Sequence, residues 1–191
     1  NGIFKLFIDK ETSDNFHSHV GNSVEVFPMN QFKSELDKLT NQSILFDPFS
    51  NVWVAHCLEK NGCKLIVKRD PCILPKACKN KTEINGMKNS HIRDGVAVCQ
   101  FLSWMSKKIK KKMKLDEGIL SDQLESFRQT KNHFKGLSFS TISASGSNAA
   151  MCHYNHKNQI NPGKLIMDSV YLVDSGGQYL DGTTDITRTV A

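Results

Sequence analysis

The chain has 191 residues, of which 39% are hydrophobic, and its 25 Lys and Arg against 19 Asp and Glu give a formal net charge of +6. This length and apolar fraction allow the core of one ordinary domain or of two small ones, and they exclude a disordered tail. No apolar run approaches the length of a membrane span, and no basic-then-apolar signal segment opens the chain, so we expect no membrane partner.

The excess positive charge is concentrated in one run, from Ser106 to Lys114. A lysine run can mark a surface that binds nucleic acid or an acidic membrane, but this one lacks interleaved aromatic residues and a base-reading motif. A solvated helix C-terminus is favoured, because cations suit the negative end of the helix dipole. We therefore expect no nucleic-acid partner; a steep salt dependence of DNA affinity would be the sign of the alternative.

The cysteines show no CxxC pair and no Cys/His spacing typical of a zinc finger. Reduced thiols in a cytoplasmic protein are expected, because a chain with a core of this size does not need disulfides. The six cysteines are Cys57, Cys63, Cys72, Cys78, Cys99 and Cys152.

The first 70 residues alternate short apolar runs with helical stretches, as α/β units do. One helix is expected from about Gln31, with Asn30 as its N-cap. A second helix is expected to begin behind Ser50 and to stop at Asn61 and Gly62. Strands are expected over residues 3–8, 24–27, 43–46 and 64–67.

Pro71 and Pro75 mark a linker, and a long helix is expected from about Thr82 to about Lys110. Its apolar residues recur at three- and four-residue spacing and form one stripe. His91 lies on this stripe, where a core or rim histidine is favoured over a ligand. The stripe consists of Ile84, Met87, His91, Val98, Leu102, Met105 and Ile109.

A shorter helix is expected after Ser121, and beyond Gly136 the pattern changes to strands and turns. Segments 137–142 and 150–154 flank the turn-forming residues 145–148, and this arrangement predicts a hairpin. An apolar strand over residues 170–173 then leads into an acidic segment.

The densest group of candidate functional residues runs from Asp174 to Arg188. Asp174 closes an apolar strand and Asp185 opens the next one, so a hairpin through the intervening glycines would bring the two carboxylates toward a shared point. Converging oxygen ligands suit hard divalent cations such as Mn²⁺ or Mg²⁺. Asp174 and Asp181 could equally serve Asp-Ser-Gly and Asp-Gly turns, in which Asp bonds its own backbone. Spacing alone leaves both interpretations open.

The segment from Tyr171 to Thr189 resembles the first metal-binding segment of the long, three-domain Xaa-Pro aminopeptidases, also called aminopeptidase P. Two further segments agree with this family in order and spacing: residues 136–154, and residues 71–80 running on into the helix around His91. The resemblance therefore covers the chain well from about residue 71. The residues before it are compatible with the tail of the family's second domain.

The resemblance implies an α/β (α+β) fold in two parts. Residues 1–74 would be the C-terminal part of a creatinase-like α/β domain, and residues 75–191 would be the N-terminal part of a pita-bread metallopeptidase domain. Because the sequence starts at Asn1 without a methionine and ends inside a patterned segment, we expect both ends to lie within a longer polypeptide. The resemblance leaves open a homodimer of that full-length, cytoplasmic enzyme.

The resemblance also assigns site residues. The position matching Asp174 binds one metal ion in the family and the position matching Asp185 bridges two, so the expected cofactors are two divalent ions, Mn²⁺ before others. The position matching His153 lies in the substrate pocket and helps to orient the substrate. One departure is Ser147, which stands where family members often have a proline and would loosen the hairpin leading to His153.

The implied substrate is a peptide with proline in second position, from which the N-terminal residue is released. Two metal ions would lower the pKa of a shared water for attack on the scissile carbonyl and would stabilise the oxyanion. A proton donor to the departing proline nitrogen is also needed. The family uses one more histidine and two glutamates as ligands, which would lie beyond Ala191. We therefore predict no complete set of catalytic residues here, no tight dinuclear site and no peptide hydrolysis by this chain alone.

Other pita-bread enzymes would share the two carboxylate ligands. The amino-acid sequence around Asp174 and Asp185, and the α/β chain ahead of the linker, argue against a methionine aminopeptidase. A prolidase remains an open alternative. A non-catalytic pita-bread module that binds peptides or proteins is a further alternative. The presence of both aspartates counts against it.

Overall fold

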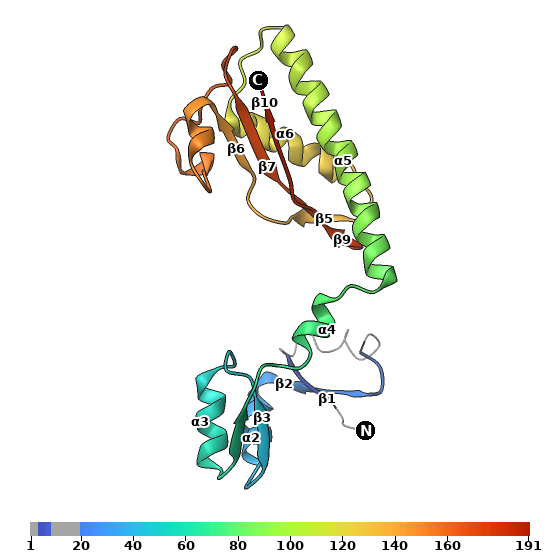
Figure 1. Ribbon diagram of the computed structural model, residues 1–191, viewed down its shortest axis with the longest axis vertical. Helices are drawn as coiled ribbons and strands as arrows, with labels where there is room; N and C mark the ends of the chain where they lie inside the picture. Colours follow the sequence, from blue (N-terminus) through green and yellow to red (C-terminus); the bar gives the residue numbers. More distant parts are fainter. Residues whose placement is uncertain (1–3, 9–19) are drawn as a thin grey trace. The chain divides into compact units, whose positions relative to one another are not determined.

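The computed structural model describes residues 4–8 and 20–191, and its contacts divide the chain into two compact units, Asn1–Cys78 and Lys79–Ala191 (Figure 1). Both units combine helices with short sheets, which confirms the mixed α/β fold class. The six cysteines all lie in the described part of the chain and are free. Within these described ranges, no helix has both the length and the apolar character that crossing a membrane would require.

The described residues of the Asn1–Cys78 unit form two pairs of parallel strands and three short helices. Its buried side chains are Leu36, Cys57, Leu58 and Cys63. The strand pairs are β1 (Phe4–Ile8) with β2 (Val24–Pro28), and β3 (Ser43–Phe46) with β4 (Lys64–Val67). The helices are α2 (Phe32–Asp37), α3 (Val52–Lys60) and α4 (Ile73–Ala77), with a 3₁₀ turn η1 (Met29–Gln31) before α2.

The four strands lie where the sequence predicts them, except that residue 3 falls outside the described residues. Both predicted helix caps are wrong. Asn51 caps α3 in place of Ser50, because its Oδ1 accepts a hydrogen bond from Trp53 N at 2.8 Å. Asn30 lies inside η1, one turn before α2. The expected linker contains helix α4, which tolerates Pro75 because a first-turn residue needs no N–H partner.

The Lys79–Ala191 unit begins with the long helix α5 (Lys81–Lys110), which starts and ends within a residue of the predicted positions. Asn80 Oδ1 accepts from Glu83 N at 2.9 Å while Glu83 Oε2 accepts from Asn80 N at 2.8 Å, so a capping box fixes the start. Helix α6 (Glu117–Gln129) starts earlier than the predicted Ser121, because Asp116 is its N-cap and accepts from Ile119 N at 2.9 Å.

The buried stripe of α5 differs from the predicted one in its first half. His91 is exposed, with Nδ1 2.8 Å from Met87 O, so of the two predicted positions, core or rim, it does not take the core one. Two polar residues, Ser90 and Asp94, are buried in its place. The complete buried set of α5 is Ser90, Asp94, Ala97, Val98, Phe101 and Met105.

Helices α5 and α6 cover one face of an antiparallel sheet with the order β10-β7-β6 (Figure 1). These strands are β6 (Ile142–Ser145), β7 (Tyr171–Ser175) and β10 (Ile186–Val190). A second antiparallel sheet has the order β5-β8-β9, with β5 (Phe134–Leu137), β8 (Gly177–Tyr179) and β9 (Gly182–Thr183). Val98 and Phe101 of α5, Leu120 and Leu124 of α6, and Tyr171 and Val173 of β7 form the shared core.

The predicted hairpin over residues 137–154 is wrong. Strand β6 pairs with β7, and the chain after it forms the 3₁₀ turn η2 (Gly146–Ala150) rather than a second strand. Ser147 therefore lies in η2, and the segment continues through η3 (His156–Asn158) before it returns to β7.

Candidate metal site

Asp174 lies in β7, and Asp185 directly precedes β10, the strand that pairs with β7. Thr187 of β10 is directly opposite Asp174 of β7. The bond from Thr184 N to Gly177 O, at 2.9 Å, continues this register past the end of β10 and places Asp185 diagonal to Asp174. Because directly paired residues point to the same face and side chains alternate along each strand, both carboxylates lie on one face. The Cα atoms of diagonal neighbours of this kind are about 7–8 Å apart.

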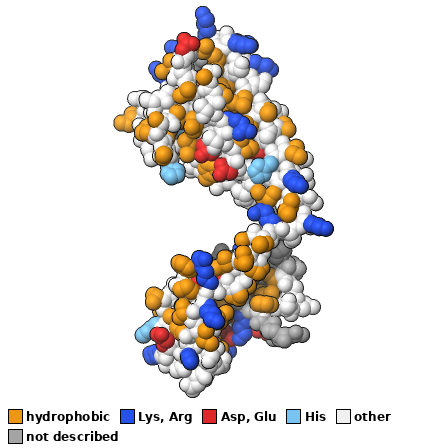
Figure 2. All heavy atoms as spheres, in the orientation of Figure 1, with side chains coloured by type: hydrophobic (Ala, Val, Ile, Leu, Met, Phe, Trp, Pro, Cys, Tyr) orange, Lys and Arg blue, Asp and Glu red, His pale blue; other side chains and the backbone are white. Residues whose placement is uncertain are grey.

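This face is the one that the helices leave free. Tyr171, Val173 and Ser175 point to the helices and are at most 2% exposed. Asp174, between them, is half-buried, and Asp185 is exposed. Figure 2 shows acidic side chains lying together over the sheet of this unit. Asp174 lies near the end of strand β7 and not in a turn, as predicted, whereas Asp185 does not open the next strand but stands one residue before β10.

Thr187 is a site residue that the sequence reasoning missed. Its Oγ1 donates a hydrogen bond to Asp174 Oδ1 at 2.8 Å, and this bond restricts the rotation of the carboxylate. The sequence could have indicated this residue, because side chains two positions apart in a strand point to the same face and Thr187 is two residues after Asp185.

Asp181, the third carboxylate of the segment, has a different task. It lies in the turn between β8 and β9, and Arg93 of α5 donates to its two oxygens at 2.9 Å each. The Arg93 hydrogen bonds hold the pKa of Asp181 below its usual range. Asp181 therefore ties the β8–β9 turn to α5, and the expectation that it serves a turn agrees with its position.

His153 lies in an exposed turn and not in a strand, and its backbone has a positive φ of 54°. The next residue, Tyr154, is buried and donates its hydroxyl to Glu117 Oε2 at 2.7 Å. The position of His153 thus depends on an anchor in α6.

Glu117 is a fully buried carboxylate that holds the segment around His153. Its Oε1 accepts from Ser145 N at 2.8 Å and from Asn148 Nδ2 at 2.9 Å, and its Oε2 accepts from Gly163 N at 2.7 Å as well as from Tyr154. Burial alone would raise the pKa of Glu117, but these four hydrogen bonds to the ionised form outweigh it and lower the pKa. Burial and the bond to Glu117 raise the pKa of Tyr154 to about 12.

A buried ion pair lies directly beneath the two aspartates. Arg128 Nε of α6 donates to Asp94 Oδ1 at 2.7 Å, and Thr184 Oγ1 donates to Asp94 Oδ2 at 2.9 Å. Burial alone would raise the pKa of Asp94, but the hydrogen bond and charge of Arg128 outweigh it, so the pKa is lowered and the pair stays charged. The sequence carries no local signal for this pair, because Asp94 and Arg128 are 34 residues apart and each alone is typical of a surface.

The donors present fit part of a metal site. Two carboxylates on one accessible face suit a hard divalent cation. Among residues 4–8 and 20–191, however, no group of three or more His, Cys, Asp or Glu side chains is arranged to hold an ion, so His153 does not join the two aspartates as a ligand.

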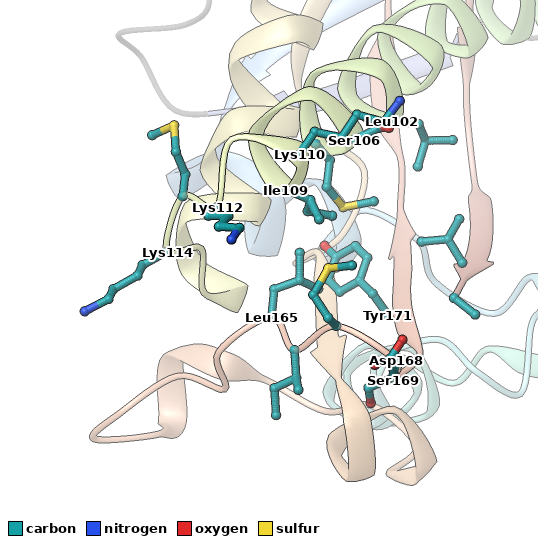
Figure 3. Close-up of a pocket in the computed structure, with 16 residues that line it drawn as sticks. Leu102, Ser106, Ile109, Lys110, Lys112, Lys114, Leu165, Asp168, Ser169 and Tyr171 are labelled. Atoms are coloured by element: carbon teal, nitrogen blue, oxygen red, sulfur yellow. The ribbon is translucent and has the colours of Figure 1, made fainter.

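A separate apolar cavity of about 680 Å³ lies at the C-terminal end of α5 (Figure 3). Figure 3 shows Ile109, Leu165 and Tyr171 around it, with Lys114 extending away from it. The lysine run reaches its rim through Lys110, Lys112 and Lys114, and α5 ends at Lys110, as predicted for a solvated helix terminus. Asp174, Asp185 and His153 are not among its lining residues.

Comparisons with known families match both parts of the chain. Residues 85–191 match metallopeptidase family M24, and residues 2–83 match the creatinase/prolidase N-terminal domain. The chain is 41% identical over 197 aligned residues to Xaa-Pro aminopeptidase ApepP of Drosophila melanogaster, covering 100% of this chain and 32% of the fly protein. The chain thus spans about a third of the length of this relative.

Solved structures show the same likeness. The X-prolyl aminopeptidase of Caenorhabditis elegans, described as a cytosolic enzyme with a di-nuclear active site, superposes with a TM-score of 0.81 at 31% identity, over 96% of this chain and 30% of the worm chain. The prolidase of Pyrococcus horikoshii has a TM-score of 0.74 at 18% identity, over 97% of this chain and 51% of its own, and shows the fold alone. The resemblance to Xaa-Pro aminopeptidases is therefore confirmed, and the chain belongs to metallopeptidase family M24, with a creatinase-type segment ahead of its pita-bread part.

Proposed function

We propose that this chain is part of a metal-dependent Xaa-Pro aminopeptidase and supplies two of its metal ligands, Asp174 and Asp185. The observation that carries the proposal is their shared register: both carboxylates lie on the sheet face that α5 and α6 leave free. The 41% identity to the fly Xaa-Pro aminopeptidase supports the same reading. The proposed substrate is a peptide with proline in second position, from which the N-terminal residue is released.

The residues of this chain would divide the work as follows. Asp174 and Asp185 would hold divalent cations, and Thr187 fixes the rotation of the Asp174 carboxylate through its 2.8 Å hydrogen bond. His153 would contact the substrate from its exposed turn, held in place through Tyr154 and Glu117. When bound, the cations would activate a water for attack on the scissile carbonyl. We propose two ions per complete site, by analogy with the worm enzyme described as di-nuclear, and Mn²⁺ as the cation, because the family resemblance implies it and carboxylate ligands suit a hard divalent ion.

The proposed domain boundary lies between residues 74 and 75, with a creatinase-like part before it and a pita-bread part after it. The two family matches, over 2–83 and 85–191, support a division in this region. A cytoplasmic location is proposed because the worm relative is described as cytosolic. A homodimer of the full-length enzyme remains an expectation from the family.

The test is hydrolysis of Xaa-Pro peptides in the presence of Mn²⁺ by a polypeptide that contains this chain and continues past Ala191. We expect release of the N-terminal residue from an Xaa-Pro-Xaa peptide, and loss of this activity in Asp185→Asn. Cleavage restricted to Xaa-Pro dipeptides would indicate a prolidase instead.

The 191-residue chain itself is expected to show no hydrolysis, since two carboxylates cannot complete the coordination of two six-ligand ions. Measurable Xaa-Pro hydrolysis by the purified 191-residue chain would overturn this part of the proposal.

A further inference from the structure

Asp94 of α5 and Arg128 of α6 form a buried ion pair in which both side chains are 0% exposed. Arg128 Nε donates to Asp94 Oδ1 at 2.7 Å and Arg128 Nη2 donates to Asp94 Oδ2 at 3.0 Å, so the contact is bidentate. Such geometry fixes both the distance and the relative orientation of the two side chains.

Three hydroxyl groups from the β-strand segments complete this cluster. Tyr179 OH donates to Asp94 Oδ1 at 2.8 Å, and Thr184 Oγ1 donates to Asp94 Oδ2 at 2.9 Å. Arg128 Nη2 also donates to Ser175 Oγ at 3.1 Å. The ion pair therefore binds β7, β8 and the segment that leads into β10, all at once.

Two of these hydroxyl residues are the immediate neighbours of the proposed metal ligands. Ser175 follows Asp174, and Thr184 precedes Asp185. Because side chains alternate along a strand, a hydroxyl fixed on the helix side fixes the carboxylate beside it on the opposite side. Thr184 Oγ1 also accepts from Gly177 N at 2.8 Å, which holds the two segments in their common register.

A role in stability alone explains this cluster poorly. Replacing a buried ion pair by well-packed apolar side chains is often neutral or stabilising, because burying two charges carries a large desolvation cost. Among the described residues, Arg128 Nη1 is buried and has no hydrogen-bond partner, which opposes folding. The pair thus fixes geometry at an energetic cost.

We infer that Asp94 and Arg128 are positioning residues for the metal site: through Ser175 and Thr184 they set the separation and orientation of Asp174 and Asp185. This inference rests on the proposed function, since it concerns the same two carboxylates. According to this inference, the cluster increases the affinity of Asp174 and Asp185 for the metal ion and does not only stabilise the folded core.

The test compares variants of the full 191-residue chain, labelled with ¹⁵N and titrated with Mn²⁺ up to millimolar concentration. Paramagnetic broadening of the Asp174 and Asp185 amide signals gives an apparent Kd for a single weakly bound ion. Thr184→Val keeps the side-chain shape but removes both hydroxyl contacts, and we expect its Kd to rise about tenfold, at the low end of the effect of residues behind a metal ligand. Thr184→Ser keeps the hydroxyl and should stay within about twofold of the wild type.

Tyr179→Phe is the matched control, because it removes a bond to the same Asp94 carboxylate from a residue that adjoins neither ligand. It should lower stability and leave the Kd within about twofold. Should Thr184→Val fail to fold, Ser175→Ala tests the same inference beside Asp174. A Thr184→Val chain that binds Mn²⁺ like the wild type, or a Tyr179→Phe chain that loses as much affinity as Thr184→Val, overturns the inference alone. No broadening at Asp174 and Asp185 in the wild type contradicts the proposed function, and the inference with it.

Discussion

Thr187 and Asp174 face each other across the β7–β10 ladder, and the threonine hydroxyl donates to Asp174 Oδ1 at 2.8 Å. Outer-shell hydrogen bonds of this kind orient a metal-binding carboxylate before the ion arrives. The pair therefore links a strand register, which the backbone sets, to the direction of one carboxylate.

Thr187→Val should weaken Mn²⁺ binding to the 191-residue chain by about tenfold, because the Asp174 carboxylate becomes free to rotate. Its stability should change by no more than about 0.5 kcal/mol, since Thr187 is exposed. Thr187→Ser is the control and should bind like the wild type. Line broadening by Mn²⁺ and urea unfolding measure the two effects; unchanged affinity in Thr187→Val would show that the hydrogen bond has no part in the site.

Glu117 makes the stability of the Lys79–Ala191 unit depend on pH. Its folded-state pKa is lowered, so its stabilising contribution is complete above its unfolded pKa of about 4.3 and is lost as the pH falls through the folded value. Glu117→Gln removes the negative charge and places an amide NH2 against two of the four donors, so it should lower the free energy of unfolding by about 1–3 kcal/mol at pH 7.

The difference between the wild type and Glu117→Gln should shrink as the pH falls from about 5, measured by urea unfolding at several pH values. Asp122→Asn, an exposed carboxylate on the same helix, should change stability by no more than about 0.5 kcal/mol. A Glu117→Gln deficit that stays constant down to pH 3 would contradict the anchoring role of the ionised carboxylate.

Gly176, directly after β7, allows a close approach to Thr184, which lies two residues before β10 and beside Asp185. A Cβ at this position would lie 1.9 Å from Thr184 O and 2.2 Å from Ser138 Oγ, so Gly176→Ala must push these segments apart. We expect a loss of about 1–3 kcal/mol together with weaker Mn²⁺ binding.

The matched control for this change is Gly95→Ala in the middle of α5, where an added Cβ meets nothing within 4 Å. It should gain about 0.5–1 kcal/mol, because alanine is the better helix former. Equal stability of Gly176→Ala and Gly95→Ala in thermal unfolding would refute the close approach of Gly176 to Thr184.

The elements that follow from local patterns could be predicted from the sequence. Strands β3 and β4 and the bounds of α5 depend on short apolar runs and on a cap at Asn80, all of which are visible locally. The strand ending near Asp174 has the same origin. The role of Asp174 as a metal ligand, by contrast, came from family resemblance and stays a proposal.

The predicted helix caps are wrong because neighbouring residues compete locally for the cap position, whereas the predicted hairpin and α5 stripe are wrong because of a polar partner far away in sequence. The hairpin expected over 137–154 does not form because Glu117 takes up Ser145 N and Asn148 Nδ2. The buried stripe of α5 differs from the predicted one because Arg128, 34 residues further on, offsets the desolvation of the buried Asp94 carboxylate. Such partners carry no local signal, since each residue alone is typical of a surface.

The most direct test of the central claim is a Mn²⁺ titration of the ¹⁵N-labelled 191-residue chain beside its Asp174→Asn/Asp185→Asn double variant. The account predicts saturable broadening centred on the amides of Asp174, Asp185 and Thr187, competed by Mg²⁺ and abolished in the double variant. Broadening of equal size in the double variant, or broadening centred on other carboxylates, would contradict it.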